Sequence, residues 1–247
     1  MKVALFVLTT FEDVFLKIND MRREQCRKHN IPVLFVYNGK VPDWYTMKDD
    51  EINHPLEGPA GCAMFVKSKL AITIFYDMFG FDPDYIVSCT SRCFVDLNKM
   101  MKVLESCPKE RVAGGVLIGP QDAKYILGIY ILFSRDVAKR FAAEDNVHGE
   151  VLWHSHDVTL SAAIKSYSDL YSLDDGYHCL TGYYLKNLSE ADIPTELPVL
   201  DDSKWLFRIK NGDDVPTPVG QGMSVGEKID VQYWKLCLKK YENITIA

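Results

Sequence analysis

Three polar residues, Thr90-Ser91-Arg92, follow the apolar run Tyr85–Cys89 and precede a second apolar segment that ends at Asp96. Hydroxyl and guanidinium groups do not hold Mg²⁺ or Mn²⁺ as carboxylate oxygens do. Arg92 instead offers a planar fork of N–H donors that matches the oxygens of a phosphate. Arg92 could therefore contact a phosphate group, and Asp96 is the carboxylate of this segment that a metal ion could use.

Four further cations could join Arg92 in binding a diphosphate. Arg208 and Lys210 lie two residues apart in an alternating segment, so both point to one face of a strand. Lys67 and Lys69 lie in the first turns of a predicted helix. A solvated edge strand is the alternative interpretation of Arg208 and Lys210, and residue types alone do not decide between the two.

A carboxylate at the start of a predicted helix, Asp157, follows the histidines His154 and His156. A general base must approach within about 3 Å of the proton that it removes, and a side chain at the edge of a sheet can do so. The alternative is that Asp157 only caps the helix, because aspartate is a favoured N-cap residue. The two imidazoles also suggest a zinc-dependent hydrolase, although Val158 and Thr159 occupy the place of its closing histidine.

The elements that must position these residues begin with a β-α-β pattern. Thr9, Thr10 and Asn38 follow the two strands of this unit. Because such units bind ligands at the carboxyl ends of their strands, the three residues are candidates for a nucleotide pocket. The alternative is that each of these three residues only caps a helix or turns the chain. The predicted strand, helix and strand are Lys2–Leu8, Phe15–His29 and Ile31–Tyr37.

The pattern continues through the chain and predicts one α/β domain over residues 1–247, with a mixed, mainly parallel sheet and helices on both faces. A polar surface excursion is expected from Pro42 to Gly61, a bend or bulge at Gly114-Gly115, and a C-terminal strand-loop-helix extension over about 203–247. Further predicted helices are Phe65–Phe79, one from near Lys99, one capped by Ser134, Val158–Tyr167 and Val225–Tyr241. Further predicted strands are one from Asp84, Arg111–Ile118, Tyr125–Phe133 and Trp205–Lys210.

Three segments, in order, resemble motifs of nucleotide-sugar glycosyltransferases of the GT-A fold, in particular the β-1,3-glycosyltransferase and Fringe-like branch. Tyr85–Asp96 is similar to the strand and turn in which that branch carries Asp-x-Asp. Gly128–Ala138 is similar to a strand that feeds the helix bordering the acceptor site, and His156–Ser161 is similar to an Asp-Asp-Val-Thr element. The compact length also resembles small glycosyltransferases of large algal viruses.

The resemblance implies the GT-A fold, a nucleotide-sugar donor such as a UDP-sugar, and a glycan acceptor. It also implies one inverting displacement, with Asp157 as general base and with Gly128 and His156 in contact with the acceptor or the sugar. The turn at 90–92 replaces the carboxylates of the motif, so a Mn²⁺ or Mg²⁺ site lacks its usual ligands, and side-chain cations would stabilise the leaving diphosphate. The same replacement leaves open a catalytically inactive protein that binds sugar nucleotides or carbohydrate.

Composition excludes several other classes of protein. With 47% hydrophobic residues, 25% charged residues and a formal net charge of −6, the chain is not expected to bind nucleic acid, which favours a basic surface. The sequence contains no run of about 18 apolar residues, so a membrane span is not predicted. Seven scattered cysteines without metal spacing predict reduced thiols and a cytoplasmic location, the host cytoplasm if the chain is viral. Dinucleotide, P-loop and nucleophile-elbow motifs are missing from the sequence.

Overall fold

The computed structural model describes residues 1–54, 60–77, 80–120, 124–144, 156–180, 188–211, 217 and 221–246. The chain divides into two compact units. The first unit comprises Met1–Thr9, Ile31–Thr90 and Ser106–Asp174, and the second comprises Thr10–Asn30, Ser91–Glu105 and Asp175–Ala247. The expected single domain over 1–247 stays a prediction.

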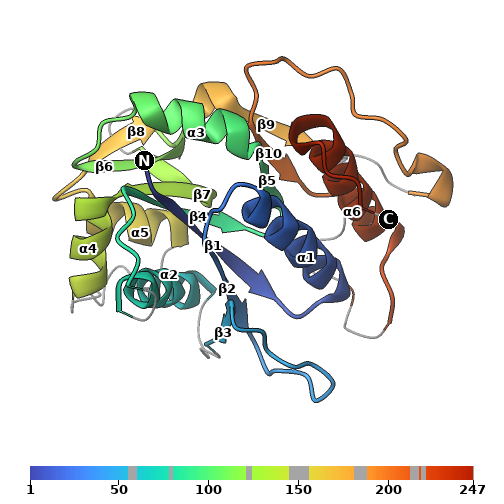
Figure 1. Ribbon diagram of the computed structural model, residues 1–247, viewed down its shortest axis with the longest axis horizontal. Coiled ribbons are helices and arrows are strands. Elements are labelled where there is room, and N and C mark those ends of the chain that lie inside the picture. Colours follow the sequence, from blue (N-terminus) through green and yellow to red (C-terminus); the bar gives the residue numbers. More distant parts are fainter. Residues whose placement is uncertain are drawn as a thin grey trace. The chain divides into compact units, whose positions relative to one another are not determined.

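The first unit is built on a seven-stranded sheet with the order β3-β2-β1-β4-β7-β6-β8 (Figure 1). Strand β4 runs parallel to β1 and antiparallel to β7, and β6 runs antiparallel to β7 and parallel to β8. Strand β2 starts at the same edge as β1, because the Leu5 N–H donates to the Pro32 carbonyl (2.9 Å). The sheet is therefore mixed and mainly parallel, as predicted. Its strands are β1 (Val3–Thr10), β2 (Val33–Asn38), β3 (Glu51–Asn53), β4 (Tyr85–Thr90), β6 (Val112–Ile118), β7 (Tyr125–Ser134) and β8 (Asp169–Ser172).

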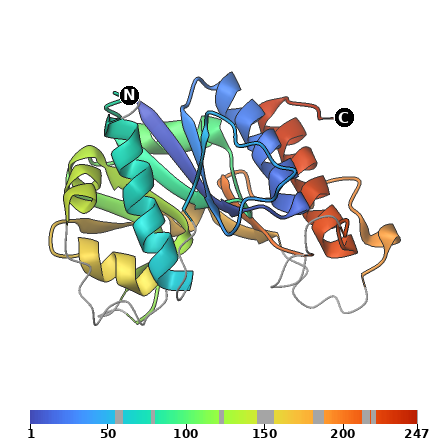
Figure 2. The ribbon, with the colours of Figure 1, turned by 90° about the horizontal axis from the view of Figure 1, so that it is seen from below.

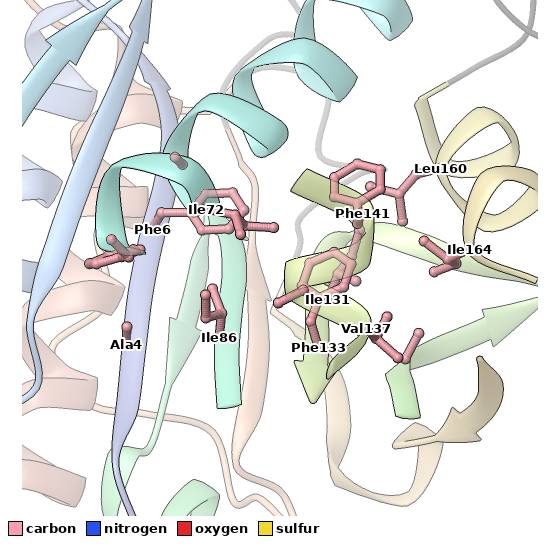
Figure 3. Close-up of a cluster of buried hydrophobic side chains, with 14 of the residues drawn as sticks. Ala4, Phe6, Ile72, Ile86, Ile131, Phe133, Val137, Phe141, Leu160 and Ile164 are labelled. Atoms are coloured by element: carbon pink, nitrogen blue, oxygen red, sulfur yellow. The ribbon is translucent and has the colours of Figure 1, made fainter. Parts of the chain in front are cut away.

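Three helices cover one face of this sheet: α2 (Ala60–Asp77), α4 (Arg135–Ala143) and α5 (His156–Ile164). Figure 2 shows α2 in teal and α5 in yellow on that face. Alternate residues of β1 explain its continuous apolar run: Phe6 packs against the helices, while Leu5 and Val7 are buried on the opposite face. Figure 3 shows the packed side chains from both layers, among them Ala4, Phe6, Ile86, Ile131 and Phe133 from the strands and Ile72, Val137, Phe141, Leu160 and Ile164 from the helices.

The second unit contains a three-stranded sheet with the order β5-β10-β9, in which β10 is antiparallel to β5 and parallel to β9. Helices α1 and α6 pack against each other and against one face of this sheet. Phe94 lies at the centre of the core, with its ring 5.0 Å from that of Trp234 in an edge-to-face contact. The strands are β5 (Cys93–Val95), β9 (Tyr177–Leu180) and β10 (Leu206–Ile209). The helices are α1 (Asp13–Lys28), α3 (Leu97–Ser106), α6 (Val225–Cys237) and the short η2 (Asp174–Gly176), η3 (Glu190–Asp192) and η4 (Leu238–Glu242).

The structure refines several local predictions. The predicted polar excursion contains β3, whose three residues are too few to show a pattern in the sequence. Ser134 occupies the N-cap position of α4, but its side chain does not cap the helix. Its Oγ accepts from the Val112 N–H (3.0 Å) and donates to the Asp136 carboxylate (2.6 Å). The predicted bulge is confirmed, because the β6–β7 register shifts between Gly115 and Leu117.

Within the described part of the chain, no helix combines the length and the apolar character that crossing a bilayer requires.

Candidate active site

The carboxyl ends of three parallel strands meet at one edge of the first unit's sheet. Strand β1 ends at Thr10, β2 at Asn38 and β4 at Thr90. The register pairs Leu8 with Thr90, and Asn38 belongs to the strand on the other side of β1. Strand order reverses at β1, which is where open α/β sheets bind their ligands. We call the edge formed by Thr9, Asn38 and Thr90 the strand-end site.

Strand β7 brings Gly128 to the same edge. This strand runs antiparallel to β4, and its Tyr130 pairs with Cys89, the residue before Thr90. Gly128 lies two residues before Tyr130, so it is level with the end of β4. Gly128 is buried and has no side chain, so it contributes only backbone to this edge.

Helix α5 also begins at this edge of the sheet, and its first two residues are His156 and Asp157. The helix leads into β8, whose Asp169 pairs with Val112 at the start of β6 and so lies at the opposite edge. Helix α5 must therefore run away from the strand-end site. The structure describes the backbone of His156 and Asp157, which form the first turn of α5.

A buried hydrogen bond anchors α5 at this place. The Oγ of Ser161 accepts from the N–H of Ile126 (2.9 Å), near the start of β7. The positive end of the helix dipole favours a carboxylate in the first turn. The His154 of the predicted zinc hydrolase site lies outside the described residues.

Lys67 is a buried lysine on α2, with 2% of its surface exposed. Strand β3 ends at the same edge as β2 and β4 starts at the opposite edge, so α2, which joins them, begins at the strand-end edge. Burial lowers the pKa of Lys67 to about 8, because removal from water disfavours the charged form. The ammonium still predominates at pH 7, and an anionic ligand beside it would raise the pKa of Lys67 again. Lys69 donates instead to the backbone carbonyl of Glu144.

Ser91 and Arg92 belong to the second unit, where both contact α1. Ser91 Oγ donates to Oδ1 of Asn19 (3.1 Å), and the Arg92 guanidinium lies 5.3 Å from the centre of the Phe15 ring. Arg92 also accepts, through its carbonyl, from the N–H of Ile209 (2.8 Å). Asn19 was not among the predicted site residues. Its signal in the sequence is its place next to Ile18 on the buried face of α1.

Arg208 lies on β10 and Lys210 just after that strand. Arg208 is half-buried, and it pairs in register with Cys93 on one side and with Cys179 on the other. Burial raises the pKa of Tyr177, and neighbouring Arg208 opposes that rise. Lys210 is buried, with 8% exposed. Arg208 alternates with Phe207 and Ile209 of the core and so points to the other face of the sheet, whereas Lys210 follows the end of the strand.

Asp96 acts as a helix cap. Its Oδ1 accepts from the N–H of Lys99 (3.1 Å) at the start of α3, and only 2% of the residue is exposed. Burial raises the pKa of the Asp96 carboxyl, which disfavours the charged form that a metal requires. In the described part of the chain, no three or more His, Cys, Asp or Glu residues are grouped as metal ligands.

Two cavities lie at the opposite, amino-terminal edge of the first unit's sheet, with volumes of about 520 and 370 Å³. Neither cavity lies at the strand-end site. We place the candidate active site at the strand ends, because side chains already in ion pairs line both cavities, with Lys139 3.0 Å from Asp82 in the first. In the second, Arg135 pairs with Asp84 (2.7 Å).

Comparison with known proteins bears on the fold. A scan against family models and a search of curated proteins found no match. Among solved structures, a glycosyltransferase involved in glycosylation of the major capsid of PBCV-1 is similar, with a TM-score of 0.54 and 9% identity over 94% of this chain and 99% of that chain. The chain has the GT-A fold.

Other similar structures have lower scores. The galactosyltransferase LgtC, solved with donor and acceptor sugar analogues, has a TM-score of 0.44 and 8% identity over 74% of this chain and 76% of that chain. Protein A197 from STIV has a TM-score of 0.38 and 13% identity over 70% of this chain and 82% of that chain. The shared fold thus rests on the capsid glycosyltransferase, and it confirms the predicted fold class.

Proposed function

We propose that this protein transfers a sugar from a nucleotide-sugar donor, a UDP-sugar, to a carbohydrate hydroxyl. One observation carries the proposal: predicted donor residues Thr9, Asn38 and Thr90, the backbone of Gly128 and the first turn of α5 gather at one edge of one sheet. That edge is where α/β sheets bind ligands. The GT-A fold, shared with a capsid glycosyltransferase, supports the same activity.

In the proposed reaction, Asp157 is the general base. It accepts the proton of the acceptor hydroxyl as the acceptor oxygen bonds to the anomeric carbon. The bond from that carbon to the donor phosphate oxygen breaks, and the nucleoside diphosphate leaves with the electron pair. A single displacement of this kind inverts the anomeric configuration.

The leaving diphosphate needs positive charge, and this chain's own cations supply it in the proposal. Lys67 is buried on the helix that begins at the strand-end site, and its ammonium becomes more stable beside a phosphate. Arg92, Arg208 and Lys210 are the further candidates from the second unit. Thr9, Thr10 and Asn38 are the candidates for contact with the nucleoside.

The residues in place of the usual carboxylates do not fit a Mn²⁺ or Mg²⁺ site. The Ser91 hydroxyl donates to Asn19, and Asp96 caps α3 with its pKa raised by burial. No step of the proposed reaction is therefore routed through a metal ion.

Addition of UDP is expected to raise the melting temperature in the presence of a chelator. At about 100 times its Kd, a ligand of the native state adds about 2.7 kcal/mol of stability. For a chain of this size that is a shift of about 5–10 °C in a thermal-shift assay. A shift that requires Mn²⁺ would contradict the metal-free reaction, and no shift with UDP or any UDP-sugar would contradict the donor site itself.

Lys67→Met is expected to raise the free energy of unfolding near neutral pH by about 1–3 kcal/mol, because it removes a buried charge and keeps the volume. The folded-state pKa of about 8 lies below the ordinary 10.5, so the unfolded state binds the extra proton between these values. Wild-type stability therefore rises with pH in that window, and the gain from the substitution should shrink there. Urea denaturation near pH 7 and pH 10 measures both effects.

The matched control is Lys102→Met, which changes an exposed lysine of α3. Its effect on the free energy of unfolding should stay within about 0.5 kcal/mol at both pH values. A lower free energy of unfolding in Lys67→Met, or an increase that does not depend on pH, would contradict the presence of a buried ammonium removed from water. The substitution should also weaken UDP binding, which calorimetry measures.

A protein that binds sugar nucleotides without turnover is the second candidate. The replacement of the motif's carboxylates by Thr90, Ser91 and Arg92 favours it. A zinc hydrolase that uses His154, His156 and Asp157 is a third reading, and stoichiometric zinc in the purified protein would support it.

A further inference from the structure

The larger cavity, of about 520 Å³, lies at the amino-terminal edge of the first unit's sheet. Its walls come from the last turns of α2, from the segment Gly80–Asp82 and from the second half of α4. Its volume falls within the range of about 300–1,000 Å³ that is usual for small-molecule sites. The strand-end site lies at the other edge of the same sheet, so this cavity has no part in the proposed transfer.

Ion pairs fix the charged wall of the cavity. Lys139 Nζ lies 3.0 Å from Oδ1 of Asp82, and Arg135 lies 3.4 Å from Oδ2 of the same carboxylate. The hydrogen bond from Lys139 lowers the pKa of Asp82, so this carboxylate is charged at neutral pH. Lys139 also lies 5.0 Å from the centre of the Tyr76 ring. The polar groups are therefore positioned before any ligand arrives.

The charged side chains that line the cavity determine whether a charged or a neutral ligand is favoured. Asp77 and Asp82 present carboxylate oxygens, which repel phosphates and other anions. Lys139 pairs with the Asp82 carboxylate (3.0 Å), and its positive charge disfavours a metal ion there. Carboxylates accept hydrogen bonds, and a lysine donates them, so a neutral molecule with many hydroxyl groups satisfies both.

Apolar wall residues complete the match. Phe81 and Ala142 offer apolar surface beside the polar groups. A sugar ring has the same division, with C–H groups on its faces and hydroxyls at its rim, and C–H groups favour the negative face of an aromatic ring. We propose that this cavity binds one or two units of a neutral carbohydrate, at a second site separate from the strand-end site.

The consequence of a second site is retention of a glycan chain. A glycan held in this cavity keeps its other units at a high effective concentration near the same protein. The cavity's own residues would hold the glycan whether or not the protein carries out the proposed transfer.

Chemical shifts of the isotope-labelled full chain, titrated with neutral methyl glycosides and with maltotriose at about 20 mM, test the proposal at the millimolar affinity expected of single sugar units. The expected result is a set of shifts in the backbone amides of Thr73–Asp77, Phe81–Asp82 and Lys139–Ala143. Shifts confined to the strand ends, or no shift with any of these sugars, would overturn it.

Ala143→Trp should abolish these shifts, because it fills the cavity from an exposed position. The matched control is Ala162→Trp, an exposed alanine of α5 outside the cavity, which should leave them unchanged. If Ala143→Trp alters the fold, Asp77→Asn replaces it and should weaken the binding at least threefold. Equal binding by wild type and both cavity variants would overturn the proposal.

A parallel titration with UDP separates the two proposals. Glycoside shifts at the cavity without a UDP response would leave the second site standing and remove the donor site. A UDP response at the strand ends without glycoside shifts at the cavity would support the donor site and overturn the second carbohydrate site.

Discussion

Asp157→Asn is expected to lower kcat by about 10²- to 10⁴-fold, because the amide cannot accept the proton of the acceptor hydroxyl. The Kd for UDP should change little, since the base acts on the acceptor and not on the nucleotide. Steady-state kinetics with the best donor and acceptor, together with calorimetry for UDP, measures the two quantities separately. The position of Asp157 in the first turn of α5, at the edge that holds the strand-end site, is the physical reason for the expectation.

A matched control is Asp169→Asn, in the same unit. Asp169 is an exposed carboxylate that pairs with Arg111 (3.5 Å) at the opposite edge of the sheet. Loss of the Asp169 carboxylate should leave kcat within about twofold of the wild-type value, because exposed ion pairs contribute little. A normal kcat in Asp157→Asn would remove Asp157 as the base. Donor binding without turnover in the wild type, over a wide panel of acceptors, would favour the binding protein instead.

The long elements of the fold could be predicted because their physical signals are local. Strands β1 and β4 are buried on both faces, so both are largely apolar, and β1 contains the continuous apolar run Val3–Leu8. Strands β3, β5, β8 and β9 have three or four residues each, too few to show a period. Partner strands far away in the sequence define them, as when Val95 pairs with Leu206.

The candidate site could be predicted only in part, for a related reason. Strand ends mark Thr9, Asn38 and Thr90, and topology then brings them together. Residue type did not decide between ligand and structural roles. Asp96 could bind a metal or cap a helix, and its hydrogen bond to the Lys99 N–H favours the cap.

The cavity at the amino-terminal edge left no signal in the sequence at all. Its walls combine α2 and its following segment with α4, more than 50 residues further along the chain. No local pattern marks Asp77 or Lys139 as neighbours. Such a site follows from the way α2 and α4 pack on one sheet face, which only the folded structure supplies.

Glu242→Ala is expected to cost about 3–5 kcal/mol of unfolding free energy, the usual effect of removing one partner from a buried charged network. Glu242 is fully buried at the end of η4. Its carboxylate accepts from Gln25 Nε2 (2.9 Å) and from the N–H of Leu97 (3.0 Å), and it pairs with His29 Nε2 (2.5 Å). Removing the carboxylate takes this acceptor from the buried N–H of Leu97 and leaves Gln25 Nε2 with the Val95 carbonyl (2.6 Å). Urea denaturation, followed by the fluorescence of buried Trp234, measures the loss.

Glu190→Ala is the matched control, because Glu190 pairs with Lys228 at the surface of the same unit. Its cost should stay below about 1 kcal/mol. An equal cost for the two variants would contradict a central role for Glu242.

The network also bears on the proposed donor site. Glu242 joins the end of α1, through Gln25 and His29, to the start of α3. The same helix α1 carries Asn19 and Phe15, which hold Ser91 and Arg92. If Arg92 binds the diphosphate, loosening α1 lowers the fraction of molecules in which its guanidinium is in place. Glu242→Ala should therefore raise the Kd for UDP even at temperatures where the variant is folded, whereas Glu190→Ala should not. An unchanged Kd in the folded variant would show that α1 does not position Arg92 for the diphosphate.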